Sequence, residues 1–299
     1  MSSFQSILLC LISFSVFGQS NSISVVPFTL ENNGIYIYCK INETDSLKFL
    51  FDTGADGTVI NGQSLEKLNL KIDSQTLNIG SNGSNMVDVS SSNTILFGGI
   101  TATGVPLPII PYETTQFDGV FGTNLMSKHI IEIDYDKSEL RFYEISSYQN
   151  DLKSYEKFKI HYVENYPTIK SALWVNGKKY SGFFGLDTGA DNTLTISPFY
   201  SVKNKFEEKM KKIGLAISQG SDGSKYESPV VLAPEIHLGN KSLYEVPIDL
   251  SQSASGVHAT KEIAGFYGNS ILKRFNIVLD LKNEFIYLKL NKNLYTAFY

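Results

Sequence analysis

The chain has 299 residues, of which 42% are hydrophobic and 19% charged, a composition that excludes a disordered protein. The net charge of −4 comes with no basic block, so there is no electrostatic footprint for nucleic-acid binding. Two cysteines, Cys10 and Cys39, are too few for a disulfide framework, and 17 Tyr and 19 Phe favour β-structure.

The N-terminus carries a short apolar run over residues 7–17, followed by the small residues typical of a signal-peptide cleavage site. We therefore predict a signal peptide over residues 1–18 and an exported protein, periplasmic or extracellular, with no membrane span after signal removal. The run lacks a preceding Lys or Arg, which leaves an uncleaved membrane anchor as the alternative. Cys10 lies in this segment. Cys39 lies in an apolar strand-like run, and we expect it to be a buried structural thiol.

The next elements along the chain are strands, and each has a counterpart in the second half. Short β-rich or alternating runs are predicted in the first half at residues 35–41, 47–51, 93–97 and 130–143. Their second-half counterparts are residues 168–175, 182–186, 230–238 and 277–290. Asn82-Gly83 and Asp222-Gly223 are strong hairpin-turn pairs.

One helix is predicted, beginning at Ser197 as N-cap with Pro198 in the first position. Its apolar positions recur at spacings of three and four, at Phe199, Val202, Phe206, Met210 and Ile213.

An internal duplication explains these matched elements. The string D-T-G-A-D begins at Asp52 and again at Asp187, and other landmarks, among them Gly122 and Gly268, follow in the same order at a slowly growing offset. The sequence therefore predicts two homologous lobes, over residues 22–147 and 157–299, joined by a polar connector.

The repeated D-T-G strings are the strongest chemical signal. Each Asp follows an apolar strand, and a pseudo-two-fold axis between homologous lobes would bring Asp52 and Asp187 face to face. Two carboxylates a few Å apart cannot both ionise cheaply, so they share one proton. Such a pair can activate a water and protonate a carbonyl oxygen without a covalent intermediate.

These residues resemble a known family. The segment F-L-F-D-T-G-A-D-G-T-V-I (49–60) is similar to the active-site segment of retroviral aspartic proteases, the retropepsins. F-D-G-V-F-G-T-N-L-M (117–126) resembles their apolar-apolar-Gly motif, which A-G-F-Y-G-N-S-I-L (264–272) repeats. Retropepsins carry one motif per chain, whereas this chain carries two, as pepsin-like and bacterial retropepsin-like enzymes do.

The resemblance implies a mostly β fold of two retropepsin/pepsin-like β-barrel lobes related by a pseudo-two-fold axis, with few short helices. It implies Asp52 and Asp187 as the catalytic dyad. Other roles at matched positions follow from it: cross-bracing of the two loops by Thr53 and Thr188, N–H groups offered to the carboxylates by Gly54 and Gly189, flaps at Gly80, Gly83, Gly220 and Gly223, and packing behind the loops by Gly122 and Gly268.

Two departures matter. Pepsin-like lobes usually carry Ser or Thr after D-T-G, and here Ala55 and Ala190 stand there. A missing hydroxyl removes a hydrogen bond to the carboxylate and should raise the pKa of the pair, so we predict a mildly acidic to near-neutral optimum. No Tyr lies near Gly80, where pepsin-like flaps often have one.

Other signals are weaker. The four His show no metal-ligand spacing and are interpreted as ordinary surface or core residues, so neither a metal nor a cofactor is predicted. Asp56 and Asp191 are second-tier candidates for tuning the dyad or binding substrate termini. Residues 106–112 and 246–250 are candidate cleft walls.

The function predicted is an aspartic endopeptidase, monomeric, acting on extended peptide or protein substrates through strand-like main-chain pairing. Two alternatives remain. One is a non-catalytic peptide-binding protein of the same fold. The other is a structural β-rich surface module, which would not require a buried acidic pair.

Overall fold

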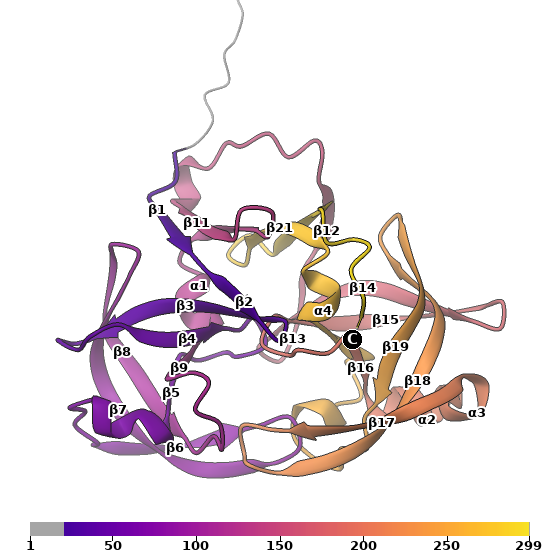
Figure 1. Ribbon diagram of the computed structural model, residues 1–299, viewed down its shortest axis with the longest axis horizontal. Coiled ribbons are helices and arrows are strands. Elements are labelled where there is room, and N and C mark those ends of the chain that lie inside the picture. Colours follow the sequence, from indigo (N-terminus) through magenta and orange to yellow (C-terminus); the bar gives the residue numbers. More distant parts are fainter. Residues whose placement is uncertain (1–20, 299) are drawn as a thin grey trace, which may run out of the picture.

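The computed structural model describes residues 21–298, so the predicted signal peptide lies outside the described residues. Two eight-stranded sheets lie side by side, and a six-stranded sheet lies across one end of both (Figure 1). The first sheet runs in the order β2 (Thr29–Glu31), β3 (Gly34–Ile41), β4 (Leu47–Phe51), β9 (Gly119–Phe121), β5 (Val59–Asn61), β8 (Ile100–Ile110), β7 (Ser84–Phe97) and β6 (Ser74–Ile79).

The second sheet repeats this topology strand for strand. Its order is β13 (His161–Val163), β14 (Tyr166–Val175), β15 (Lys178–Asp187), β20 (Gly265–Gly268), β16 (Leu194–Ile196), β19 (Lys241–Leu250), β18 (Lys225–Leu238) and β17 (Lys211–Gln219). Additional pairings of β3 with β7 and of β14 with β18 close each sheet into a barrel. The predicted fold class, mostly β with two matching barrel lobes, is confirmed.

The six-stranded sheet is built from both halves of the chain. Its order is β1 (Ser24–Pro27), β11 (Glu139–Tyr143), β10 (Ile130–Asp134), β21 (Phe275–Asp280), β22 (Phe285–Leu290) and β12 (Glu156–Lys159). This order is symmetric about the junction of β10 and β21, where Glu132 pairs with Val278. The pseudo-two-fold relation between the halves therefore passes through this junction.

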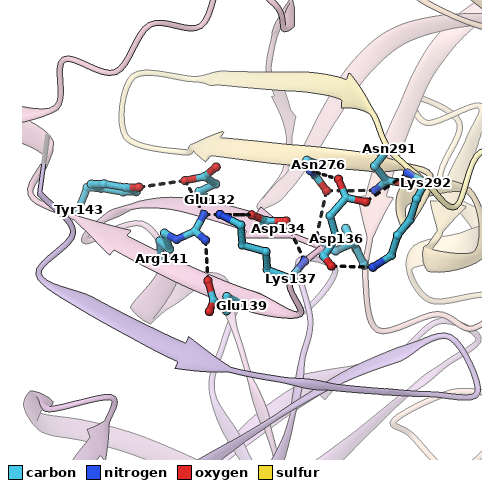
Figure 2. A network of polar contacts seen from close by, with 11 residues as sticks. Glu132, Asp134, Asp136, Lys137, Glu139, Arg141, Tyr143, Asn276, Asn291 and Lys292 are labelled. Carbon is cyan, nitrogen blue, oxygen red and sulfur yellow. Dashed lines mark hydrogen bonds and ion pairs between the residues drawn. The ribbon is translucent and has the colours of Figure 1, made fainter. Parts of the chain in front are cut away.

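Polar contacts reinforce that junction, as Figure 2 shows. On the first-half side, Arg141 forms ion pairs with Glu132, Asp134 and Glu139. Across the junction, Asn276 Nδ2 donates to Asp136 Oδ2 at 2.9 Å, and its Oδ1 accepts from the Tyr135 amide at 3.0 Å. The shared sheet is thus joined by side chains as well as by the β10–β21 ladder.

All eight predicted runs contain strands, most with wider bounds than predicted; β7 begins nine residues before the predicted run 93–97. The runs 130–143 and 277–290 each form two strands joined by a tight turn, in which Ser138 (φ 59°) and Glu284 (φ 63°) adopt left-handed conformations. Both N-G and D-G hairpins are confirmed, joining β6 to β7 and β17 to β18.

The predicted helix is partly wrong. It is short and broken: α2 (Pro198–Asn204) ends where Lys205 turns left-handed at φ 55°, and α3 (Phe206–Lys209) adds one further turn. The chain then continues as strand β17, in which Lys211 pairs with Leu232 of β18. Sheet pairing therefore overrides the helical spacing beyond residue 210, and Val202 is 77% exposed rather than part of an apolar face.

The other helical turns are short: α1 (Thr123–Met126), α4 (Asn269–Leu272), η1 (Gly62–Lys67), η2 (Ile145–Ser147) and η3 (Val257–Ala259). Among the described residues, no helix is both long and apolar enough to cross a membrane. Cys39 is a buried free thiol, as expected, and burial raises its pKa.

Candidate functional site

The repeated D-T-G segments meet between the two barrels. Asp52 follows β4 directly and Asp187 is the last residue of β15, so both side chains leave equivalent strand ends. The parallel pairing of Phe51 with Phe121 has its counterpart in that of Leu186 with Tyr267. The structure thus brings the two carboxyl groups together, and they share a hydrogen bond.

Four hydrogen bonds fix the loops to one another, and the two threonines make all of them. The Thr53 amide donates to Thr188 Oγ1 at 3.0 Å and the Thr188 amide to Thr53 Oγ1 at 3.1 Å. Each hydroxyl then donates at 2.8 Å across the interface, Thr53 to the Leu186 carbonyl and Thr188 to the Phe51 carbonyl. Both threonines are buried, so this reciprocal brace holds the aspartates in register.

Glycine is required beside each carboxyl group. A Cβ on Gly54 would lie 2.8 Å from Asp187 Cγ, and one on Gly189 would overlap the Asp52 carboxyl group. The amide of Gly54 donates to Asp52 Oδ1 at 2.7 Å, and that of Gly189 to Asp187 Oδ1 at 3.0 Å. The loops therefore approach closely enough for each to contact both aspartates.

The carboxyl pair titrates differently from free aspartates. Burial raises the pKa of both groups, and the negative charge of Asp52 raises that of Asp187 further. Backbone N–H groups and the Asp187 carboxyl donate to Asp52, which favours its ionised form. These effects favour a state in which one carboxyl group of the pair keeps its proton while the other is ionised.

Gly122 and Gly268 lie behind these loops. A Cβ on Gly122 would overlap the Gly57 carbonyl, and one on Gly268 would overlap the Asn192 carbonyl. The second-tier residues link the halves: Asn165 donates to the Asp56 carboxylate at 3.1 Å, and Asn33 to the Asp191 carbonyl at 2.7 Å.

A cleft of about 550 Å³ runs over the aspartate pair. The hairpins β6–β7 and β17–β18 lie on its far side and approach each other in Figure 1. At their tips, Asn82 Nδ2 donates to Ser224 Oγ at 3.1 Å, and Ser221 Oγ to Asn78 Oδ1 at 3.3 Å. The cleft is thus covered by two hairpins in contact.

The glycines of these tips make the contact possible. Gly80 and Gly83 pack against the Asp222 carboxyl group, where a Cβ on either would collide with it. Gly220 is equally close to Asp222, and Gly223 has φ 83°, a left-handed turn conformation. The four predicted flap glycines therefore lie together at the roof of the cleft.

A segment that the sequence did not point to holds the first hairpin. The amides of Val257 and His258 donate to the Gly80 and Ser81 carbonyls, both at 3.0 Å, and Ser255 Oγ donates to the Asn82 carbonyl at 2.6 Å. With the hydrogen bond from Ser253 Oγ to the Ser81 carbonyl at 3.2 Å, four such contacts tie the hairpin tip of the first half to the second half. No sequence pattern predicted that this segment contacts the hairpin, because only the fold brings the two together.

Tyr112 lines the cleft within residues 106–112, a range predicted as a cleft wall, and burial together with both aspartates raises its pKa. Other cleft residues were not predicted. Tyr166 and Phe266 line the other side, with ring centroids 5.9 Å apart. His258, interpreted from sequence as ordinary, lines the cleft with its Nδ1 2.8 Å from Tyr226 Oη, and burial lowers its pKa to about 4.

The described residues include no group of three or more His, Cys, Asp or Glu side chains placed to hold a metal ion. The aspartate pair and its cleft together offer an acid, a neighbouring proton acceptor and space for an extended chain.

Comparison with known proteins gives one match. Residues 37–125 match the family model described as aspartyl protease, a span that includes Asp52, the first D-T-G loop and the first hairpin. A search of curated proteins found no match. Over this span the chain is similar to aspartyl proteases, and the fold of two matching β-barrels agrees with that likeness.

Proposed function

We propose that this protein is an aspartic endopeptidase whose dyad is Asp52 and Asp187. The observation that carries the proposal is the hydrogen bond between the two carboxyl groups, one from each half. Burial of two acidic groups costs folding free energy. Two carboxyl groups that share a proton at the floor of a cleft can act as general acid and general base, a role that accounts for burying them together.

In the proposed reaction, ionised Asp52 accepts a proton from a water held between the carboxyls, while Asp187 donates its proton to the substrate carbonyl oxygen. The water oxygen bonds to the carbonyl carbon and a tetrahedral diol forms. The C–N bond then breaks as the amine takes a proton from Asp52. Asp187 recovers its proton from the diol, which restores the starting state.

We propose that Thr53, Thr188, Gly54 and Gly189 support this geometry and that the two hairpins act as flaps. The substrate is an extended peptide, paired through its main chain as an added strand. The hairpins must separate to admit an extended segment of a protein substrate, since their tips are in contact over the cleft.

The remaining expectations stay proposals. We propose that the lobes span residues 22–147 and 157–299, that the protein acts as a monomer, and that it is exported. The apolar run over residues 7–17 supports export, and the two matched barrels in one chain support a monomer.

The test is a peptidase assay over a peptide library with pepstatin as inhibitor. We expect pepstatin-sensitive cleavage and a loss of about 10²–10⁴-fold in kcat/KM for Asp52→Asn and for Asp187→Asn. Asp45→Asn, an exposed aspartate outside the cleft lining, is the matched control. Peptide binding without cleavage would favour the non-catalytic alternative.

A further inference from the structure

The two walls of the cleft occupy equivalent positions but differ in chemistry. In the first half, one apolar cluster supplies the wall: Tyr36, Leu50, Ala55, Val59, Tyr112, Phe117 and Val120. In the second half, the equivalent place holds a carboxylate. The difference is best seen in one row of neighbouring strands.

That row crosses β20, β16 and β19. Thr195 pairs with Phe266 on one side and with Asp249 on the other, so the three side chains share one face, and all three line the cleft. The equivalent row in the first half contains Val120 and Val59, and continuing the β5–β8 register by one residue adds Pro108. The row in the first half is therefore fully apolar, whereas the equivalent row in the second half ends in an acid.

Asp249 is a buried acid. It is only 7% exposed, and its Oδ2 accepts a hydrogen bond from Asn192 Nδ2 at 2.5 Å. Asp249 forms no salt bridge with any Lys or Arg in residues 21–298. Burial raises its pKa, and the nearby charge of Asp191 adds to this effect. A cation beside Asp249 would therefore relieve an existing electrostatic cost.

The whole lining has the same sign. Six acidic residues and no Lys or Arg line the part of the cleft that the structure describes; the acids are Asp52, Asp56, Glu113, Asp187, Asp191 and Asp249. Two lysines near lining residues are already paired with acids, Lys225 with Glu113 at 2.5 Å and Lys48, which lies over the Tyr36 ring, with Glu31 at 2.7 Å. The field in the cleft thus favours a basic substrate.

The surroundings of Asp249 suit a long side chain with a charged end. Phe266 forms an aromatic wall, and the His258 ring lies over it with centroids 4.7 Å apart. Burial lowers the pKa of His258 to about 4, so the imidazole is neutral above that pH and does not repel a cation. Lys and Arg pack their stems against such rings and place the charge at a carboxylate.

We propose that the second-half wall is a subsite for a Lys or Arg side chain of the substrate, with Asp249 as the residue that determines this specificity. The inference rests on the proposed endopeptidase function. The apolar wall of the first half takes a hydrophobic side chain on the other side of the scissile bond. The enzyme would then select a peptide that carries both.

The experiment compares two peptides that differ only in Lys against norleucine, which keeps the stem and removes the charge. Both kcat/KM and the dissociation constant are measured on wild type, Asp249→Asn, Asp249→Glu and the control Asp45→Asn. Binding is followed by fluorescence anisotropy on the Asp187→Asn background, where no hydrolysis is expected.

We expect wild type to prefer Lys by about 10- to 100-fold, the effect of one charge-assisted hydrogen bond. Asp249→Asn should bring the ratio near one, Asp249→Glu should retain part of it, and Asp45→Asn should leave it unchanged.

A wild-type ratio near one, or a ratio that survives Asp249→Asn, would overturn the inference while leaving the peptidase function intact. Absence of cleavage together with a Lys preference in binding would overturn the peptidase function and support the subsite. Absence of all peptide binding would overturn both.

Discussion

The two halves of the cleft share a floor and differ in their walls. The floor is symmetric: the same D-T-G loops, the same threonine brace and the same close glycines appear twice. The walls are not, since Val59 is matched by Thr195 and the position of Pro108 by Asp249. Duplication thus preserved the groups that must meet at the axis, whereas the side chains away from it were free to diverge.

The largest effects are expected from the symmetric floor. Gly54→Ala and Gly189→Ala should each lower kcat/KM by at least about 100-fold, because a Cβ would displace the opposite carboxyl group. Gly189→Ala should cause the larger loss of activity, because its Cβ would lie closer to Asp52 Cγ than the 2.8 Å at which the Cβ of Gly54→Ala would lie from Asp187 Cγ. Gly214→Ala, with open space around its Cβ, is the control. Retained activity in either loop variant would mean that the aspartate pair tolerates displacement.

The brace should matter equally in both halves. Thr53→Val and Thr188→Val each remove a buried hydroxyl that donates one hydrogen bond and accepts another, leaving a carbonyl and an amide unpaired. We expect each to lower the free energy of unfolding by about 2–3 kcal/mol, measured by urea denaturation. Unequal losses would show that one half stabilises the interface more than the other.

The walls should be exchangeable in part. Val59→Thr copies the second-half residue into the apolar cluster, and we expect it to weaken the preference for a hydrophobic side chain about 5-fold, through a polar group placed against that side chain. Cleavage profiles of a library with varied hydrophobic residues measure this. The matched control is Thr195→Val, which should leave the hydrophobic preference as it is, because Thr195 lies in the opposite wall.

The smallest effect concerns pH. The folded pKa of both aspartates is raised, so the acid form persists to higher pH, and Asp52 becomes an active base only above its pKa. The acid limb of the pH–rate profile should therefore lie in the mildly acidic range. Ala55→Ser adds a donor to the ionised carboxylate and should move that limb about 0.5 unit lower. An acid limb that stays in place or moves to higher pH in Ala55→Ser would show that a hydrogen bond to the ionised carboxylate does not set the pKa of the pair.

Local pattern predicted a good part of this molecule. The apolar runs marked β3, β4, β14 and β18, and the N-G and D-G pairs marked the hairpin turns, because these features depend on near neighbours. The helix failed beyond residue 210 because β17 pairs there with β18, a contact no local spacing reveals. The same limit hid the docking of the hairpin tip on Ser255, Val257 and His258.

By itself the sequence determined that the chain is a duplication and which two acids are equivalent, since repeated strings can be matched without coordinates. The tertiary structure decided that these acids share a hydrogen bond, that the hairpins touch, and that Asp249 lies buried in a cleft with no Lys or Arg among its described lining residues. Distances across a barrel interface depend on how strands far apart in the chain are ordered in a sheet, and that order comes from packing the whole core.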